Sequence, residues 1–397
     1  MQPTRQANLT SIRRDAWIEV DLNSLEHNVR VIRQKLEDVR QNLYKGSPLP
    51  KLMAVVKSDA YGHGAIPLSQ LFAATDMDYL GVASIDEGTQ IRDSGVTLPI
   101  LILSPTPTWG IAAALENNLE MTVSTEKQLE EISQKARGSG KQAAIHLKID
   151  TGMHRLGVPL DRLPAILGTV VQDRSLKLVS VFSHLANASN ESSVQEQKKL
   201  FDQAVAMTRK LFPQAIFHLA SSEAAMRFPD CHYDMVRVGL HLYGLEPNTV
   251  SDFLRPALSV KARINHTNTI AAGERVGYGS TWTAERTTRL AAIPVGYADG
   301  VDRGLSNKMK GLLAGKVIAQ VGRISMDQML FDITDVPEAG EGDMITLIGN
   351  EDEHSLYLSD WAESLDTITY ELACRLRARL PRIYTRNKLA QTKQPKT

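Results

Sequence analysis

Cysteine is scarce in this sequence, with only Cys231 and Cys374 among 397 residues. Two thiols are too few for a disulfide framework or a cysteine-based zinc site, so we expect both to be packed side chains. Net charge is also absent, because 45 Lys and Arg residues balance 45 Asp and Glu residues. The missing basic field argues against nucleic acid or an anionic membrane as partner and favours a small-molecule substrate.

Long apolar runs are missing as well. No stretch approaches the roughly 20 apolar residues of a membrane span, and the first residues, MQPTRQANLTSIRRDAW, lack the apolar core of a secretory signal. We therefore expect a cytoplasmic protein. At 397 residues the chain is longer than one hydrophobic core usually becomes, which predicts two domains.

From residue 51 onward, short β-rich runs alternate with amphipathic helical stretches, the pattern of βα units on a parallel sheet. The expected strands are 51–58, 78–84, 99–104, 120–124, 144–150, 178–184, 215–220 and 235–240. Eight such units predict a (β/α)8 barrel of the TIM type.

After about residue 256 the hydrophobic pattern changes to alternating or apolar runs separated by glycine-rich turns. This pattern is typical of a mainly β domain. One helical stretch is expected within it, at 359–380. The predicted organisation is a flexible N-terminal extension, a barrel, a β-rich C-terminal domain and a disordered tail, at 1–15, 16–255, 256–388 and 389–397.

Polar side chains gather where the predicted strands end. In (β/α)8 enzymes the chemistry lies at the C-terminal ends of the strands, and five of the eight ends carry such groups here: Lys57, Arg155, His184, Ser221 with Ser222, and Arg237 with Gly239. Taken singly, each is more often structural, as a solvated lysine or an ion-paired arginine. Independent surface residues would be spread over both rims, so the gathering predicts one active site.

Lys57 follows the apolar run LMAVV. Burial and neighbouring cations lower the pKa of a lysine ammonium, which lets the amine condense with an aldehyde cofactor. Hydroxyl groups and free backbone N–H groups after the last two strands would suit a phosphate, as in many such barrels.

The segment AVVKSDAYGHG (54–64) resembles the cofactor-lysine motif of the alanine racemases. Similar matches to this family run from about residue 16 to 385, in LKIDTGMHRLG (147–157), FSHLANAS (182–189), HLASSEAAM (218–226), VRVGLHLYG (236–244), GERVGYGST (273–281), IPVGYADG (293–300) and VGRISMDQ (321–328). Many separate motifs in family order make the resemblance specific.

The resemblance implies a pyridoxal 5'-phosphate-dependent enzyme that interconverts L-alanine and D-alanine and supplies D-alanine for peptidoglycan. It implies that Lys57 carries the cofactor and serves as one base, while Tyr278 of the partner subunit serves as the other. The active sites of a homodimer would then be shared between its subunits.

Further roles are implied for residues around the cofactor and the substrate. The phosphate-binding residues would be Tyr61, Ser222, Gly239 and Leu240. His184 would lie beside the ring, and Arg237 would face the pyridine nitrogen. Arg155 would bind near the substrate carboxylate, held by Lys148, a residue that is carbamylated in many members. The substrate entrance would be shaped from the partner subunit by Tyr297, Met326 and Asp327.

The sequence departs from the common family pattern in three places. Ser58 and Asp59 stand inside the lysine motif, where they are expected to tune rather than perform the chemistry. Ala378 replaces a tyrosine near the phosphate, which shifts phosphate binding toward Tyr61 and Ser222. Ser221 and Ser325 replace a common asparagine and a common cysteine.

Racemisation suits these residues because a proton must leave one face of the α-carbon and return to the other, which requires two acid/base groups. The ordinary pKa values of lysine and tyrosine, roughly 10.4 and 10, are close, and Arg155 and Arg237 are expected to lower both. A guanidinium holds its proton firmly. Arg237 should therefore leave the ring nitrogen unprotonated and disfavour the ring-carbon protonation that leads to transamination.

Three alternatives remain open at this point. A racemase of broader range is typically exported, which this N-terminus does not support. A barrel-type decarboxylase would carry a carboxylate instead of Arg237. A non-catalytic cofactor-binding protein would resemble the barrel alone, without residues 256–385.

Overall fold

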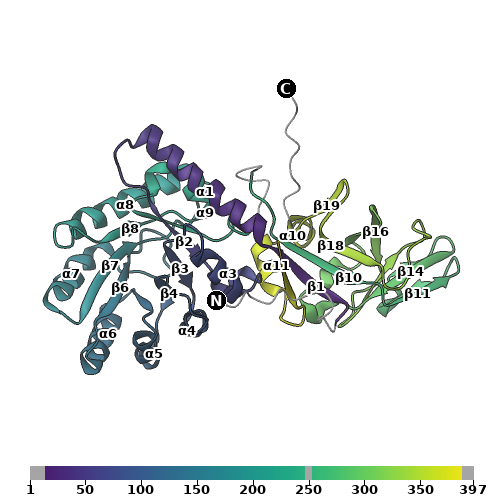
Figure 1. Cartoon of the computed structure of the whole chain (residues 1–397), viewed down its shortest axis with the longest axis horizontal. Coiled ribbons are helices and arrows are strands. Elements are labelled where there is room, and N and C mark those ends of the chain that lie inside the picture. The colour runs from purple at the N-terminus through teal and green to yellow at the C-terminus, as the bar shows by residue number, and fades with distance from the viewer. Residues whose placement is uncertain (1–13, 246–252, 387–397) are drawn as a thin grey trace. The chain divides into compact units, whose positions relative to one another are not determined.

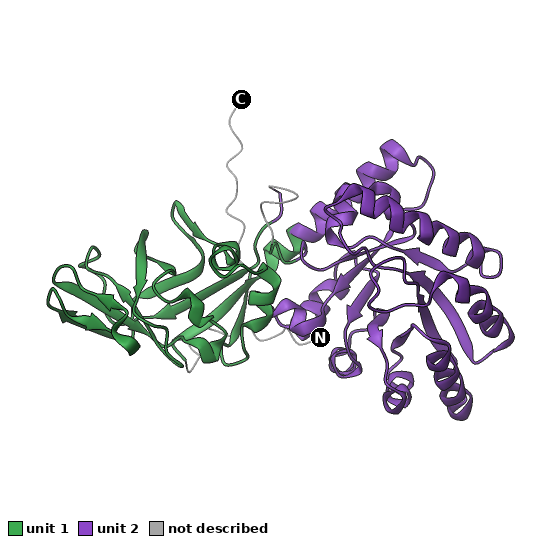
Figure 2. Ribbon diagram, turned by 180° about the vertical axis from the view of Figure 1, so that it is seen from behind, with its two compact units in different colours: residues 1–27, 243–246, 255–397 green, residues 28–242, 247–254 purple. Residues whose placement is uncertain are grey.

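The computed structural model describes residues 14–245 and 253–386. The predicted extension at 1–15, apart from its last two residues, and the predicted tail at 389–397 lie outside these ranges. Contacts within the chain define two compact units, shown in Figure 2. Unit 1 comprises residues 1–27, 243–246 and 255–397, and unit 2 comprises residues 28–242 and 247–254.

Unit 2 contains a nearly closed barrel of eight parallel strands, in the order β8-β7-β6-β5-β4-β3-β2-β9. The strands are β2 (Lys51–Val55), β3 (Tyr79–Val82), β4 (Ile100–Pro105), β5 (Glu120–Val123), β6 (Ala143–Lys148), β7 (Leu176–Phe182), β8 (Ile216–His218) and β9 (Met235–Val238). Backbone bonds from Asp234 N to Phe217 O (2.9 Å) and from Arg237 N to Ala220 O (3.1 Å) join the two ends of the sheet. The eight predicted strands and the barrel fold are confirmed.

Helices lie on the outside of these strands (Figure 1). They are α1 (Leu22–Leu43), α3 (Ala65–Ala73), α4 (Ile85–Asp93), α5 (Ile111–Glu116), α6 (Glu126–Ser139), α7 (Leu163–Gln172), α8 (Glu191–Arg209) and α9 (Ser222–Arg227). The short element α2 (Lys57–Tyr61) follows the C-terminal end of β2, and its backbone at 58–60 is left-handed. Side-chain caps set where several begin; for example, the Thr125 hydroxyl accepts from Gln128 N at 3.2 Å. In α6 the buried residues recur at helical spacing, at Leu129, Ile132 and Ala136, so one face packs on the barrel.

Unit 1 is mainly β, as predicted for the C-terminal part of the chain. Its strands are β1 (Ala16–Asp21), β10 (Leu258–Arg263), β11 (His266–Ile270), β12 (Arg275–Val276), β13 (Trp282–Thr283), β14 (Thr288–Ile293), β15 (Lys310–Leu313), β16 (Lys316–Val321), β17 (Met329–Asp332), β18 (Met344–Glu351), β19 (His354–Leu356) and β20 (Arg382–Thr385). A ten-stranded sheet runs β11-β14-β17-β16-β15-β18-β10-β1-β20, with β19 paired to β18.

Two features of unit 1 differ from the sequence reading. Strand β1, which falls in the segment predicted for the barrel, instead pairs antiparallel with β10 and parallel with β20. The single helical stretch expected at 359–380 is two shorter helices, α10 (Leu358–Leu365) and α11 (Thr369–Arg375). Asp366 divides them, because its left-handed backbone (φ 52°) ends α10.

None of the helices within residues 14–245 and 253–386 has both the length and the apolar character that a membrane span requires.

Candidate active site

Lys57 stands at the C-terminal end of β2, on the rim where (β/α)8 enzymes carry their chemistry. The residues before it, Leu52 to Val56, are buried, and Lys57 itself is half-buried. A backbone bond from Val56 N to Gly81 O (2.8 Å) continues the sheet up to this point. The lysine therefore projects from a rigid element rather than from a loop.

The chain after Lys57 turns in the left-handed direction. Four consecutive non-glycine residues, 58–61, have φ between 53° and 55°, a conformation that costs roughly 1–2 kcal/mol for each residue. Glu87 helps to hold it, because its two carboxylate oxygens accept from Ser58 N and Ala83 N, each at 2.7 Å. Strain that is maintained by its surroundings in this way is common at functional sites.

Asp59, one of the residues that depart from the family motif, also supports this turn. Its carboxylate accepts from Ala65 N at 2.7 Å and so caps the first turn of α3. Gly62 N returns to Ser58 O at 3.0 Å. The departures at Ser58 and Asp59 are thus accommodated in backbone support, on exposed positions.

The turn brings Tyr61 to the backbone after β9. A Cβ placed on Gly239 would lie 2.8 Å from the Tyr61 hydroxyl, so only glycine allows this approach. Gly239 N donates to the Ser222 hydroxyl at 2.9 Å, and Leu240 follows directly. Two hydroxyls and a backbone N–H therefore converge in one small region of unit 2, which is a donor set that suits a phosphate.

Arg237 is the most enclosed charge among the predicted site residues, with 5% of its surface exposed. Its Nη2 donates to Ser183 O (2.7 Å) and to Leu219 O (2.9 Å). Its Nη1 faces His218 Nδ1 at 2.9 Å. Burial lowers the pKa of the guanidinium to about 10, which still leaves it charged at neutral pH.

Lys148 and Arg155 lie on β6 and the loop that follows it. The loop is folded around Asp150, whose carboxylate oxygen accepts from Gly152 N and His154 N at 3.0 Å each. Lys148 is 6% exposed. Burial, followed by the charges of Arg237, Arg155 and Lys57, lowers the pKa of Lys148 to about 8.

His184, which directly follows β7, meets the same charges. Burial, followed by Arg237, Lys148, Arg155 and Lys57, lowers the pKa of His184 to about 3. The structure thus brings Lys57, Lys148, Arg155, His184 and Arg237 into one electrostatic neighbourhood. His184 is neutral there, because a further cation would be repelled by the others.

The remaining predicted residues lie in unit 1. Tyr278 opens a short 3-10 turn, η5 (Tyr278–Ser280), and is 72% exposed. Its neighbour Gly277 (φ 71°) leaves room for the backbone of Arg323, since an added Cβ would lie 3.2 Å from Arg323 N. The turn is therefore held against the segment that continues to Met326.

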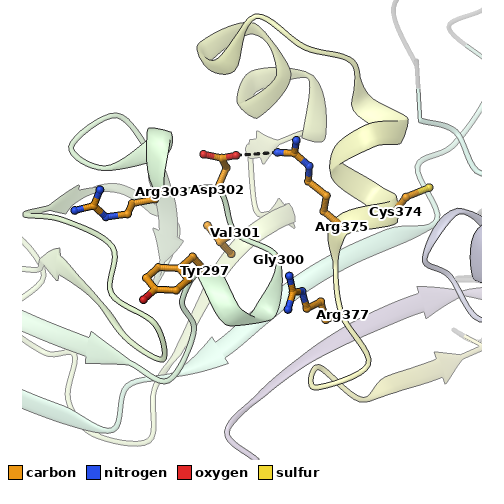
Figure 3. A pocket seen from close by; sticks show the side chains of 8 residues that line it. All are labelled: Tyr297, Gly300, Val301, Asp302, Arg303, Cys374, Arg375 and Arg377. Atoms are coloured by element: carbon orange, nitrogen blue, oxygen red, sulfur yellow. Dashed lines mark hydrogen bonds and ion pairs between the residues drawn. The ribbon is translucent and has the colours of Figure 1, made fainter.

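Tyr297, Met326 and Asp327 form a second group in unit 1. Tyr297 N donates to Ser325 O at 3.0 Å, and Asp327 pairs with Arg379 at 2.6 Å. Tyr297 is 40% exposed and Met326 53% exposed. Tyr297 also borders a hollow of about 640 Å³ in which Asp302 pairs with Arg375 (Figure 3); its lining is completed by Gly300, Val301, Arg303, Cys374 and Arg377.

Sequence reasoning missed the polar residues inside the barrel. His146, Ser180 and His218 are fully buried and lie on β6, β7 and β8, where most of the other residues are apolar. The Ser180 hydroxyl lies 2.5 Å from His146 Nδ1 and 2.8 Å from His218 Nε2. A polar residue with apolar neighbours along a predicted barrel strand was the available signal, since such a group needs a buried partner.

Two family models show to which protein family this chain is related. The alanine racemase N-terminal domain model matches residues 20–247, and the alanine racemase C-terminal domain model matches residues 257–384.

This chain belongs to the alanine racemase family.

Individual members of the alanine racemase family agree along nearly the full length. The chain is 41% identical over 379 residues to the alanine racemase of a Nostoc species, covering 93% of this chain and 95% of that one. It is 40% identical to the Synechocystis alanine racemase, covering 94% and 99%. A solved Clostridium difficile alanine racemase superposes with a TM-score of 0.87 at 32% identity, covering 95% and 97%.

A solved Bacillus anthracis alanine racemase with bound L-Ala-P has a TM-score of 0.86 at 31% identity, covering 95% of this chain and 96% of that one. Both domain models match in sequence order, so the alanine racemase resemblance seen in the motifs is confirmed for both units.

The lowered pKa of His184 predicts an acid-dependent loss of stability. Between its ordinary pKa and about 3, the unfolded chain binds a proton that the folded chain does not, so the free energy of unfolding falls as pH falls. One such proton contributes at most about 1.4 kcal/mol per pH unit. Urea unfolding of the wild type and of His184→Gln at several pH values below neutrality should show a shallower fall in the variant. Parallel curves would contradict the assignment.

Proposed function

We propose that this protein is a pyridoxal 5'-phosphate-dependent alanine racemase with active sites shared between the subunits of a homodimer. One observation carries the proposal. A lysine on the C-terminal rim of the barrel is followed by a turn that brings Tyr61 to Gly239 and Ser222, and a buried arginine lies on the neighbouring strand β9. The chain matches relatives named alanine racemase over almost their whole length.

The residues present fit the cofactor. Lys57 supplies the amine, at the end of a buried strand. Tyr61, Ser222 and Gly239 would hold the phosphate, and the close approach that only a glycine at 239 allows is the observation that supports this. Leu240 N would contribute a further donor. Arg237 would meet the ring nitrogen, and His184 would lie along the ring as a neutral imidazole.

Pyridoxal phosphate, when bound, supplies an electron-withdrawing group that acidifies the α-proton of an amino acid. Lys57 would remove that proton from one face, and the Tyr278 phenol would return a proton to the other. The reverse direction exchanges their roles. Arg155 would hold the substrate carboxylate, because its charge lies among the cations around Lys148 and His184.

Arg237 distinguishes this chemistry from decarboxylation or transamination. The guanidinium can only donate, so a cofactor ring nitrogen held against it would accept a hydrogen bond and remain unprotonated. The α-carbon is then the favoured position for the returning proton. The product D-alanine would be available for peptidoglycan.

Shared sites would explain the exposure of the unit 1 residues. Tyr278, Tyr297 and Met326 are 72%, 40% and 53% exposed, and an interface with a partner subunit would cover large side chains of this kind. A partner subunit that covers them would bring Tyr278 to its own Lys57. Tyr297, Met326 and Asp327 would then shape the substrate entrance.

Lys148 is proposed to carry a carbamate. Its pKa of about 8 leaves part of the amine neutral at neutral pH. The neutral nitrogen can bond to the carbon of carbon dioxide and release one N–H proton to solvent. An anionic carbamate would replace a cation that lies near Arg155 and Arg237, and it would hold Arg155 by charge.

The proposed activity predicts exchange at the α-carbon. Purified protein with pyridoxal phosphate and L-alanine in deuterated water should lose optical rotation while deuterium enters Cα. Lys57→Ala should abolish both, and Lys127→Ala, at a lysine side chain that is 84% exposed, should change neither. Release of carbon dioxide would point to a decarboxylase, and no reaction at all would leave a cofactor-binding protein.

Shared sites predict complementation between two inactive variants. Lys57→Ala and Tyr278→Ala homodimers should each be inactive, whereas mixing their subunits should restore activity. With random mixing, half of the dimers are mixed and one of their two sites is intact, so about a quarter of the wild-type activity is expected. No recovery, despite mixed dimers confirmed by mass spectrometry, would reject shared sites.

The carbamate predicts a carbon signal that depends on Lys148. Protein equilibrated with ¹³C-labelled bicarbonate should show one carbamate resonance for each chain, which Lys148→Gln should remove. The control Lys127→Gln should retain it. A resonance that is absent from the wild type would exclude the modification.

A further inference from the structure

A continuous hydrogen-bond chain crosses the barrel interior from Arg237 to Glu120. Arg237 Nη1 faces His218 Nδ1 at 2.9 Å, and His218 Nε2 lies 2.8 Å from the Ser180 hydroxyl. The Ser180 hydroxyl lies 2.5 Å from His146 Nδ1, and His146 Nε2 lies 2.6 Å from Glu120 Oε2. Five side chains from five strands are therefore linked in series.

The donor at one end of the chain, Arg237, and the acceptor at the other, Glu120, determine where the protons lie. An arginine N–H can only donate, so His218 Nδ1 must accept, and its proton sits on Nε2. An ionised carboxylate can only accept, so His146 Nε2 must carry a proton. If both imidazoles are neutral, the hydroxyl of Ser180 accepts from His218 and donates to His146. Every bond then has one proton, and all donors point from Arg237 toward Glu120.

The order of the protons along this chain affects the stability of Arg237, because most of the chain is buried. His146, Ser180 and His218 have no exposed surface and Arg237 has 5%, while the Glu120 side chain is 17% exposed at the start of β5. No ion pair among the described residues includes Arg237. A buried cation without a direct counter-charge is costly, and a polarised chain of hydrogen bonds transmits part of the stabilisation from a distant anion.

We propose that Glu120 is a positioning residue: as the anionic end of this chain, it fixes the proton positions of both histidines and so keeps the Arg237 guanidinium oriented and charged. Only the effect of Glu120 on the bound cofactor rests on the proposed function, in which Arg237 faces the cofactor ring. Glu120 lies at the opposite end of the strands from Lys57, and it acts entirely through the intervening side chains.

A second side chain besides His146 donates to the Glu120 carboxylate. Tyr79 donates a side-chain hydrogen bond to Glu120, and burial followed by the charge of Glu120 raises the pKa of that phenol. The rings of Tyr79 and His146 meet edge to face at 6.4 Å between centroids. The carboxylate therefore has two donors among the described residues, Tyr79 and His146, and His146 is the last donor of the chain.

Nitrogen NMR of histidine-labelled apoprotein tests the proton order without any cofactor. In the wild type, His146 and His218 should both give neutral imidazole signals with the proton on Nε2. Glu120→Gln should move the His146 signals toward the other tautomer, because an amide donates as well as accepts, and should also move those of His218. The matched control is Glu130→Gln, at an exposed position of α6, which should move neither.

A second readout uses the loaded protein. Glu120→Gln should shift the absorption band of the bound pyridoxal phosphate and lower kcat about tenfold with KM little changed, comparable to the loss of an outer hydrogen-bond partner elsewhere. Glu120→Asp should restore both in part. A purely structural role for Glu120 would change stability and leave the absorption band in place.

The outcomes separate this inference from the proposed function. A doubly protonated His146 or an Nδ1 proton on His218 in the wild type would overturn the chain, even if the protein racemises alanine. Identical spectra for Glu120→Gln and Glu130→Gln would also overturn it. The expected proton order in a protein that does not racemise would instead reject the function and leave the chain standing. If Glu120→Gln does not fold, the wild-type spectrum alone decides.

Discussion

The buried guanidinium of Arg237 is the constraint on which the polar interior of the barrel depends. A cation with 5% exposure must find its stabilisation within the protein, and it does so through the carbonyls of Ser183 and Leu219 and through His218. Its charge also acts on its neighbours. The pKa values of Lys148 and His184 fall because burial and this cation both disfavour another positive charge.

In the barrel, regular strands and one strained turn position different groups of the candidate site. Strand ends place Lys57, Lys148 and Arg237 on a rigid framework. The left-handed segment 58–61 then turns the chain so that the Tyr61 hydroxyl reaches Gly239. Strain of several kcal/mol over four residues persists because the side-chain carboxylates of Glu87 and Asp59 accept from backbone N–H groups of and beside the turn. The same segment therefore links the lysine to the hydroxyl and backbone N–H groups around Gly239.

Unit 1 contributes exposed side chains to the candidate site residues. Its ten-stranded sheet holds the turn of Tyr278 and the segment around Met326 by backbone contacts, such as the Tyr297 N to Ser325 O bond of 3.0 Å. The side chains themselves remain exposed. Rigid support for exposed side chains is what a residue needs when it acts on a site outside its own unit, as the shared-site proposal requires.

Local pattern determined much of this protein. Alternating strands, helix caps and strand-end residues depend on neighbours in sequence, so the eight barrel strands, the β-rich second part and the family motifs could be predicted. Only the tertiary structure decided that Ala16–Asp21 pairs with β10 and β20, that residues 58–61 turn left-handed, and that Glu120 connects to Arg237. Each of these depends on partners distant in sequence, whose positions follow from the closing of the sheets and leave no mark on local periodicity.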